Sequence, residues 1–230
     1  MPAYLHIFFD LDHTLWDFER NSSETLAELY EHYQLHQYGS FSVQEFTQTF
    51  HQVNQRLWSL YNRNIIDQHT LRHERFRYIW EALGAFGLPP SGLAEDYSAI
   101  CPTKPHLLPH ARETLDYLTT RYRLHIITNG FHDIQQIKIR SAGIAHYFET
   151  VTTSQNAGAK KPQQAIFHYA LARIGAAARQ AIMVGDNLET DITGAKSSGL
   201  DAIFYNPGQI AHQEQVTLEI RCLSELQRYL

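Results

Sequence analysis

Phe8-Phe9-Asp10-Leu11-Asp12-His13-Thr14-Leu15 places two aspartates, one residue apart, directly after an apolar run that begins at Leu5. The run is short, aromatic and β-branched, which predicts a buried strand that delivers carboxylates at its C-terminal end. In open α/β sheets, ligands bind at the carboxyl ends of the strands. The alternative is a solvated turn in which one of the aspartates caps a neighbouring group.

Later segments of the same character predict further strands of one parallel sheet. They are Leu124–Thr128, Thr150–Thr153, Ala181–Val184 and Ala202–Tyr205. Helical patterns separate them, and in the pattern that follows Thr128 one face is marked by Ile134, Ile137 and Ala142. Strands that alternate with helices predict an α/β fold in which helices cover both faces of the sheet.

Residues 17–104 differ from the rest, because they contain no convincing strand. Ser42-Val43-Gln44-Glu45 forms a capping box, in which a serine and a glutamate satisfy each other's backbone N–H groups at the start of a helix. Apolar residues from Leu71 to Leu83 predict a further helix, closed by Gly87 and Pro89-Pro90. These patterns predict an all-helical insert.

Length and composition fit a two-domain division, with residues 1–16 and 105–230 as one domain and residues 17–104 as the other. The 230 residues are 43% hydrophobic, which is enough for a core and argues against intrinsic disorder. The 24 acidic and 19 basic residues give a net charge of -5, so we expect no polymeric nucleic acid as partner.

Targeting patterns point to the cytoplasm. The two cysteines make no disulfide framework, and the N-terminus shows no basic region followed by an apolar stretch, so we expect no signal peptide. No apolar run approaches the ~20 residues of a membrane-spanning helix. We therefore expect a cytoplasmic protein that does not bind membranes and that is a monomer or a homodimer.

Three further motifs place polar groups at a strand end or a helix start. Ile126-Ile127-Thr128-Asn129-Gly130 aims a hydroxyl and backbone N–H groups at an anion. Lys160-Lys161-Pro162 precedes a helix and offers a compact positive charge. Gly185-Asp186-Asn187-Leu188-Glu189-Thr190-Asp191 offers carboxylates, which Mg²⁺ prefers as ligands. Taken singly, each is also typical of an ordinary turn, a solvated lysine or a helix cap.

The order of the four motifs resembles the haloacid dehalogenase (HAD) superfamily of phosphohydrolases. Asp-x-Asp, Thr-Asn-Gly, Lys-Pro and Gly-Asp-x4-Asp follow one another over nearly the whole chain. The resemblance implies a Rossmann-like, three-layer, doubly wound parallel sheet with an all-α helical cap inserted between the first and second motifs, where residues 17–104 lie. One departure is His13, where many members have glycine.

The resemblance also implies catalytic and metal-binding roles. Asp10 would be the nucleophile that forms an aspartyl-phosphate. Asp12 would protonate the leaving oxygen and then deprotonate the attacking water. Mg²⁺ would be bound by Asp10, the Asp12 carbonyl and Asp186, with Asp191 and Thr14 as supporting residues.

The phosphoryl group would be held by the second and third motifs. The resemblance implies contacts from the Thr128 hydroxyl and from backbone donors around Asn129. A lysine would offset the phosphoryl charge and orient the nucleophile. Of the two candidates we prefer Lys161 to Lys160, because Lys161 directly precedes Pro162.

The segments Thr14–Asn21 and Gly185–Ile192 look like the pyrimidine 5′-nucleotidase branch of the superfamily. Aromatic rings near the cap entrance would stack on a base, and polar side chains would bind its edges. The residues that would contact the substrate are His13, Trp16, Phe18 and Asn21. The alternative is that the two aromatic rings pack the cap onto the core.

The expected function is therefore Mg²⁺-dependent hydrolysis of a small phosphate monoester, most specifically a pyrimidine nucleoside monophosphate. A phosphoglycolate or sugar phosphatase and a phosphomutase are alternatives with the same fold. Dehalogenases need no acid for the leaving group, so Asp12 argues against them. A phospho-accepting regulatory module without turnover is a further alternative, but receiver domains lack the insert and the order of Lys161 before Asp186.

The chain contains 14 histidines, and several are spaced four residues apart. This spacing predicts two rings on one helix face for the pairs His32/His36, His69/His73 and His106/His110. A Zn²⁺ site is one interpretation, but no third ligand pattern accompanies any pair and none is His-Glu-x-x-His. We favour surface or half-buried polar positions.

Overall fold

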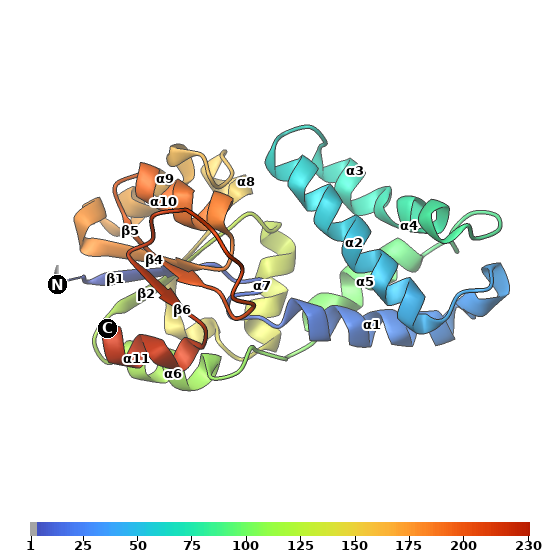
Figure 1. Cartoon of the computed structure of the whole chain (residues 1–230), viewed down its shortest axis with the longest axis horizontal. Coiled ribbons are helices and arrows are strands. Elements are labelled where there is room, and N and C mark those ends of the chain that lie inside the picture. The colour runs from blue at the N-terminus through green and yellow to red at the C-terminus, as the bar shows by residue number, and fades with distance from the viewer. Residues whose placement is uncertain (1–3) are drawn as a thin grey trace. The chain divides into compact units, whose positions relative to one another are not determined.

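The computed structural model describes residues 4–230. Residues 1–3, which belong to the N-terminal segment considered as a signal peptide, lie outside the described residues. The chain forms two compact units. One consists of the chain up to Asp17 together with Pro105–Leu230, and the other is Phe18–Lys104 (Figure 1). Over the described residues, no helix has the length and apolar character needed to cross a membrane.

A six-stranded parallel sheet with the order β3-β2-β1-β4-β5-β6 forms the centre of the first unit. The strands are β1 (His6–Phe9), β2 (Arg123–Thr128), β3 (Phe148–Thr153), β4 (Ala181–Gly185), β5 (Asp201–Tyr205) and β6 (Leu218–Ile220). The first five confirm the predicted strands to within a residue or two. The sequence analysis missed β6, because a strand of three residues is too short to show a period.

Helices cover both faces of this sheet, which confirms the predicted doubly wound α/β fold. They are α6 (Ala111–Leu118), α7 (His132–Ser141), α8 (Ser154–Ala157), α9 (Gln164–Ile174), α10 (Gly194–Ser197) and α11 (Leu226–Tyr229). In Figure 1, α9 and α10 lie on one side of the sheet, and α6 and α11 lie on the other.

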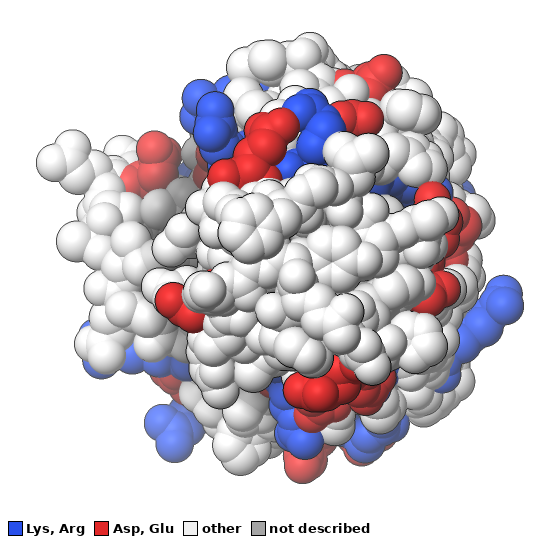
Figure 2. Space-filling model, turned by 90° about the vertical axis from the view of Figure 1, so that its right-hand side faces the viewer, with Lys and Arg blue, Asp and Glu red and all other residues white. Residues whose placement is uncertain are grey.

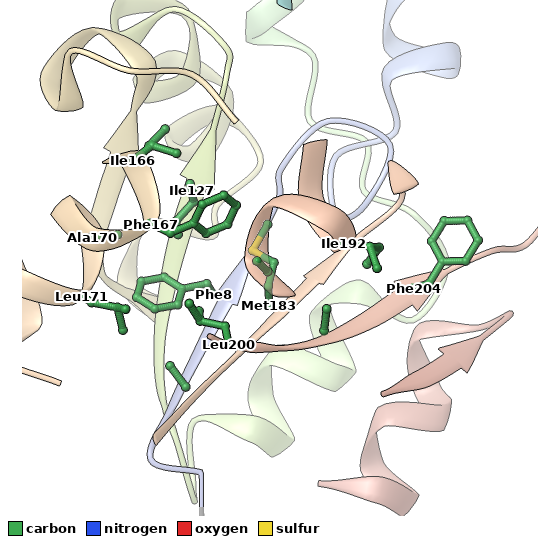
Figure 3. Packing of buried hydrophobic residues seen from close by; sticks show 13 residues of the cluster. Phe8, Ile127, Ile166, Phe167, Ala170, Leu171, Met183, Ile192, Leu200 and Phe204 are labelled. Carbon is green, nitrogen blue, oxygen red and sulfur yellow. The ribbon is translucent and has the colours of Figure 1, made fainter. Parts of the chain in front are cut away.

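The core between the sheet and α9 fixes the strands that carry the four motifs. Figure 3 shows Phe8 of β1, Ile127 of β2 and Met183 of β4 packed beside Ile166 and Phe167 of α9. All five side chains are fully buried. Burying a side chain of this size contributes roughly 1.5–3 kcal/mol, so the strand ends are held firmly in place.

The buried face of α7 carries two polar side chains, which corrects the sequence prediction. Gln135, Lys138 and Ile139 are buried on this helix. Ile134 and Ile137, which the apolar pattern placed on the inner face, are only half-buried. The contacts that hold the two polar side chains lie at the strand ends and are described below.

The second unit is all-helical, as the sequence predicts, and no strand occurs among its residues, all of which are described. Its helices are α1 (Phe18–His32), α2 (Val43–Asn62), α3 (Gln68–His73), α4 (Arg75–Leu83) and α5 (Leu93–Ile100). The capping box at Ser42 and Glu45 is confirmed at the start of α2.

Two helices, α3 and α4, replace the single helix predicted from Leu71 to Leu83. They meet at Glu74, which lies outside both helices. The end of α4 also differs from the prediction. The helix is capped by Gly84, which has φ 62°, and not by the predicted Gly87. The left-handed conformation suits glycine, which has no Cβ to clash.

The core of the second unit is aromatic and surrounds a buried arginine. The guanidinium of Arg75 lies 5.3 Å from the ring centroid of Phe50 and 4.9 Å from that of Tyr97. Its Nη1 donates a hydrogen bond to Asn54 Oδ1 at 2.9 Å. Cation–π contacts of this kind partly offset the cost of burying the charge.

Charged side chains are mixed in sign on the face of the molecule in Figure 2. Acidic and basic groups lie there in small clusters around a largely uncharged centre. This face therefore carries no extended field of one sign.

Candidate active site

The carboxyl ends of β1, β2 and β4 bring the four motifs together. Phe9 pairs with Ile126 of β2 and with Val184 of β4, so the residues that follow each strand emerge at the same edge. The backbone N–H of Asp10 continues this pattern and donates to Val184 O at 2.9 Å. Asp10 is thereby fixed at the centre of the edge, and its residue is only 8% exposed.

Lys161 lies at the centre of the polar contacts and is 2% exposed. Its Nζ lies 2.5 Å from Asp10 Oδ1 and 2.6 Å from Asp191 Oδ1, and it donates to Ile127 O at 2.9 Å. Burial by itself would lower the pKa of Lys161, but the two carboxylates outweigh burial and raise it. The side chain is therefore a permanent cation.

The side chain of Asn129 holds the Lys161 backbone in position. Asn129 Oδ1 accepts from Lys161 N at 2.7 Å, and Asn129 Nδ2 donates to Lys161 O at 2.9 Å. This reciprocal pair ties the loop before α9 to the end of β2. The Asn129 amide thus serves to place the lysine, a contact that the sequence analysis did not anticipate.

Three carboxylates form an acidic cluster at the same edge. Oxygen atoms of Asp10, Asp186 and Asp191 lie within 4.8 Å of one another. Burial raises the pKa of Asp10, and the charges of Asp191 and Asp186 raise it further against the opposing effect of Lys161. Burial and the Asp191 charge also raise the pKa of Asp186 to about 7, although a hydrogen bond from the Thr14 hydroxyl opposes this.

This acidic cluster fits a divalent cation. One lysine faces three carboxylates, of which those of Asp10 and Asp191 are buried and that of Asp186 is half-buried, so negative charge is in excess. Hard cations such as Mg²⁺ take oxygen ligands of this type. Burial is the main cause of the raised pKa values of Asp10 and Asp186, and the neighbouring carboxylates raise them further.

Asp191 reaches the cluster from the π-helical turn Leu188–Thr193, which follows β4. Asn187 N donates to Asp191 Oδ2 at 3.1 Å and fixes the carboxylate. A Cβ atom at Gly185 would lie 2.3 Å from the same oxygen. Only glycine at the end of β4 leaves room for Asp191 to approach so closely.

A second group of contacts joins β2, α7 and the loop after β1. The hydroxyl of Thr128 accepts from Gly130 N at 3.0 Å and from Gln135 Nε2 at 2.8 Å. Gln135 Nε2 also donates to Asp12 Oδ2 at 2.8 Å, while Lys138 Nζ lies 2.5 Å from Asp12 Oδ1. Both oxygens of the Asp12 carboxylate are thus bonded to α7.

These contacts lower the pKa of Asp12 and so favour the ionised form of its carboxylate. Burial by itself would raise the pKa of Asp12, but the charge and hydrogen bond of Lys138 and the hydrogen bond of Gln135 outweigh burial and lower it. Lys138 Nζ in turn lies 4.3 Å from the ring centroid of Trp16. The ring therefore forms part of the support for the lysine.

Comparison with known proteins agrees with this geometry. Residues 4–199 match the family model of the haloacid dehalogenase-like hydrolases. The chain belongs to this family. The resemblance seen in the four motifs is confirmed, and the chain is a hydrolase.

Two curated relatives of this HAD-like hydrolase cover almost its full length. It is 32% identical to pyrimidine 5′-nucleotidase YjjG of Escherichia coli K12, over 97% of this chain and 96% of that protein. It is 30% identical to pyrimidine 5′-nucleotidase PynA of Streptococcus pneumoniae R6, over 97% of this chain and 93% of that protein.

A solved structure gives the same fold. The magnesium-bound structure of the HAD-hydrolase YfnB of Bacillus subtilis superimposes on this hydrolase with a TM-score of 0.87. The two chains are 26% identical, and the alignment covers 99% of this chain and 98% of YfnB.

The residues predicted to contact the substrate are divided between the two units. In the first, Trp16 is fully buried, which favours the packing interpretation over stacking on a base. His13 is exposed and has a left-handed backbone, with φ 64°. A glycine adopts this conformation without strain, so the structure explains why glycine suits this position.

The remaining two predicted contacts, Phe18 and Asn21, belong to the helical unit and stay predictions. Phe18 is half-buried and lies edge-to-face with His51, with 6.1 Å between ring centroids. Asn21 is fully buried within α1.

Sequence reasoning missed Gln135 and Lys138. Their spacing of three residues, on the helix that follows Thr-Asn-Gly, was the available signal, but the isoleucines at neighbouring positions suggested a different inner face. Of the two candidate lysines, Lys161 contacts Asp10, and Lys160 is half-buried.

The prediction that three histidine pairs share a helix face is wrong for two pairs. Only His69 and His73 lie on one helix, α3, where their ring centroids are 4.6 Å apart. His32 ends α1 and His36 lies in the following 3₁₀ turn, Leu35–Tyr38, whereas His106 and His110 both precede α6. Among the described residues, the group able to hold a metal is the acidic cluster, which contains no histidine.

A buried histidine pair that the sequence analysis did not detect lies in the sheet. His6 Nδ1 and His125 Nε2 are 3.1 Å apart, and His125 Nδ1 lies 3.0 Å from Thr150 Oγ1. Burial lowers the pKa of His125 to about 4, and the charge of His6 acts in the same direction. The imidazole of His125 is therefore neutral near pH 7.

Proposed function

We propose that this HAD-like hydrolase cleaves phosphate monoesters in a Mg²⁺-dependent reaction that passes through an aspartyl-phosphate on Asp10. The observation that carries the proposal is the position of Asp10. Its carboxylate lies at the end of the central strand, bonded to a buried lysine and within 4.8 Å of two further carboxylates. The buried lysine offsets charge on an anionic phosphoryl group, and the surplus of carboxylate oxygens provides ligands for a divalent cation.

In the first step, a carboxylate oxygen of Asp10 attacks phosphorus and the bond between phosphorus and the ester oxygen breaks. Asp12 transfers a proton to that oxygen, so the product leaves as a neutral alcohol. The Thr128 hydroxyl, which already faces α7, and nearby backbone N–H groups hold the phosphoryl oxygens. Lys161 offsets the negative charge that develops there.

In the second step, water attacks the phosphorus of the aspartyl-phosphate. Asp12, now ionised, takes a proton from the water as the bond between Asp10 and phosphorus breaks. Inorganic phosphate leaves, Asp10 is regenerated, and Asp12 again carries the proton for the next cycle. The ionised Asp12 favoured by Lys138 corresponds to the form needed for this second step.

The acidic cluster would hold the metal ion. The Asp10 and Asp186 carboxylates and the Asp12 carbonyl would be its protein ligands, with Asp191 placed to orient Lys161. Bound Mg²⁺ would reduce the repulsion between Asp10 and the anionic substrate. The fit rests on the excess of carboxylate oxygens described above, and the magnesium-bound relative supports it.

A pyrimidine nucleoside monophosphate is the proposed substrate. Two relatives named as pyrimidine 5′-nucleotidases, each at least 30% identical over nearly the full chain, support this choice. Phe18 of the helical unit, which is half-buried, is the proposed contact with the base, because an aromatic ring stacks on a base. Asn21 is as fully buried as Trp16 and is not proposed as a contact.

A substrate panel with and without Mg²⁺ tests this function. It contains pyrimidine and purine nucleoside monophosphates, a hexose phosphate, phosphoglycolate and a 2-haloacid. We expect the highest kcat/KM with pyrimidine nucleotides and no turnover after chelation. A preference for phosphoglycolate or the hexose phosphate would contradict the substrate alone, whereas formation of an isomerised sugar phosphate would indicate a phosphomutase.

The mechanism has a separate test in the Asp10→Asn variant. An asparagine keeps the shape of the side chain but cannot act as the nucleophile, so we expect phosphate release to be abolished. Full Mg²⁺-dependent turnover by this variant would overturn the mechanism, and release of halide without release of phosphate by the wild type would overturn the assignment as a phosphatase.

A further inference from the structure

One amide nitrogen, Nε2 of Gln135, bonds two groups to which the proposed mechanism gives different tasks. It donates to the hydroxyl of Thr128 at 2.8 Å and to Oδ2 of Asp12 at 2.8 Å. Thr128 would hold the phosphoryl group, and Asp12 would transfer the proton. The side chain of Gln135 is fully buried, so these distances are set by packing and not by solvent.

Gly130 leaves the space in which the Gln135 amide lies. A Cβ atom at Gly130 would lie 1.9 Å from Gln135 Nε2 and 2.5 Å from its Cδ, so the glycine provides the space that the amide occupies. On the far side of the carboxylate, Lys138 holds the other oxygen of Asp12. Asp12 is therefore clamped between two side chains that lie three residues apart on α7.

The second polar atom of Gln135 indicates that packing alone does not account for an amide at this position. Its Oε1 is buried and has no hydrogen-bond partner among the described residues. Leaving such an atom without a partner costs about 1–3 kcal/mol. An apolar residue of the same size would avoid this cost but would not donate to Thr128 and Asp12.

We infer that Gln135 is a positioning residue, which fixes the carboxylate of Asp12 relative to the Thr128 hydroxyl so that the proton is delivered to the ester oxygen of a correctly bound phosphate. The inference rests on the proposed phosphatase function. A general acid acts only within hydrogen-bond reach of its target, and a displacement of about 1 Å can cost about a hundredfold in rate.

The test exploits the dependence of the first step on the leaving group. Uridine 5′-monophosphate loses a basic alkoxide oxygen that needs a proton, whereas p-nitrophenyl phosphate loses a stable phenolate that does not. Because kcat/KM reports the steps up to loss of the alcohol or phenolate, the ratio of kcat/KM for the p-nitrophenyl ester to that for the nucleotide measures proton delivery.

We expect Gln135→Met to raise this ratio about tenfold or more, in the same direction as Asp12→Asn. In an Asp12→Asn background, Gln135→Met should leave the ratio unchanged, because no acid remains to be positioned. Gln136→Met is the matched control, since it alters the next residue on α7 and should give the wild-type ratio. Lys138 is a less suitable target, because its removal changes charge as well as position.

An equal fall in kcat/KM for both esters, or a further rise of the ratio in the Asp12→Asn background, would assign Gln135 a purely structural role and overturn the inference. If Gln135→Met does not fold, Gln135→Glu keeps the size of the side chain, replaces the donor by an oxygen and is expected to raise the ratio as well. A wild type that hydrolyses neither ester would overturn the proposed function, and the inference with it.

Discussion

Replacing Gly130 by alanine is expected to destabilise the protein through one side chain, Gln135. Gly130 does not have a positive φ, so an alanine is compatible with the backbone. The new Cβ atom would lie 1.9 Å from Nε2 of Gln135, whereas ordinary contacts begin at 3.4 Å. The amide must therefore retreat by roughly the difference, about 1.5 Å, and this breaks its 2.8 Å hydrogen bonds to Thr128 and Asp12.

The expected loss follows from these contacts. Forcing a side chain aside in a packed region costs about 1–3 kcal/mol. Two lost hydrogen bonds cost about 0.5–1.5 kcal/mol each, and the lower entropy of the unfolded alanine chain offsets about 0.4–1 kcal/mol. We therefore expect the free energy of unfolding to fall by about 3 kcal/mol.

A double-mutant cycle in urea separates this cause from a general effect of alanine at position 130. In a Gln135→Ala background the clash is absent, so Gly130→Ala should cost less than about 1 kcal/mol, with a coupling energy of about 2 kcal/mol. Gly208→Ala is the control, because the nearest side-chain atom lies 3.8 Å from the new Cβ and the effect should stay within about 0.5 kcal/mol. Equal losses in both backgrounds would refute the reasoning.

Three further predictions concern other parts of the molecule. Lys161→Met leaves two buried carboxylates without their cation, so with EDTA the free energy of unfolding should fall by about 3–5 kcal/mol, and an unchanged urea midpoint would contradict this. Burial holds the pKa of His125 at about 4, below its unfolded value of 6.5. The neutral His125 side chain therefore makes its full contribution to the free energy of unfolding above pH 6.5, and this contribution is lost as the pH falls towards 4. The loss amounts to at most about 3 kcal/mol, and melting curves of His125→Gln between these pH values should show a weaker pH dependence than wild type; an identical dependence would exclude this cause. Ser42→Ala removes the capping box at the start of α2 and should cost about 1 kcal/mol in urea unfolding, whereas Ser42→Asp, which still caps the helix, should cost less.

Features that depend on neighbouring residues could be predicted from the sequence. The strand that ends at Asp10 shows an apolar run followed by acids, and the capping box at Ser42 is complete within four residues. The order of the motifs then places Asp10 and Asp186 at the same end of the sheet, because parallel strands all end on the same side. The structure places these two carboxylates together for that reason. Lys161 follows no strand, and its position depends on the hydrogen bonds with Asn129.

Features that depend on contacts between distant segments could not be predicted. The polar inner face of α7 exists because Gln135 finds Thr128 and Asp12, and Asp12 lies more than a hundred residues earlier in the chain. Hydrophobic periodicity assigns such a face to the nearest isoleucines instead. The pairing of His6 with His125 has the same origin, since it requires the neighbouring positions of β1 and β2 in the sheet.

The central claim is that Asp10 becomes phosphorylated during turnover, and it can be measured directly in the Asp12→Asn variant with p-nitrophenyl phosphate and Mg²⁺. This ester needs no acid in the first step, but its phosphoenzyme needs Asp12 as the base for hydrolysis. The mechanism predicts a burst of one equivalent of p-nitrophenolate per enzyme and, after acid quenching, a phosphorylated peptide that contains Asp10. Steady turnover without a burst, or phosphate on a peptide that lacks Asp10, would contradict it.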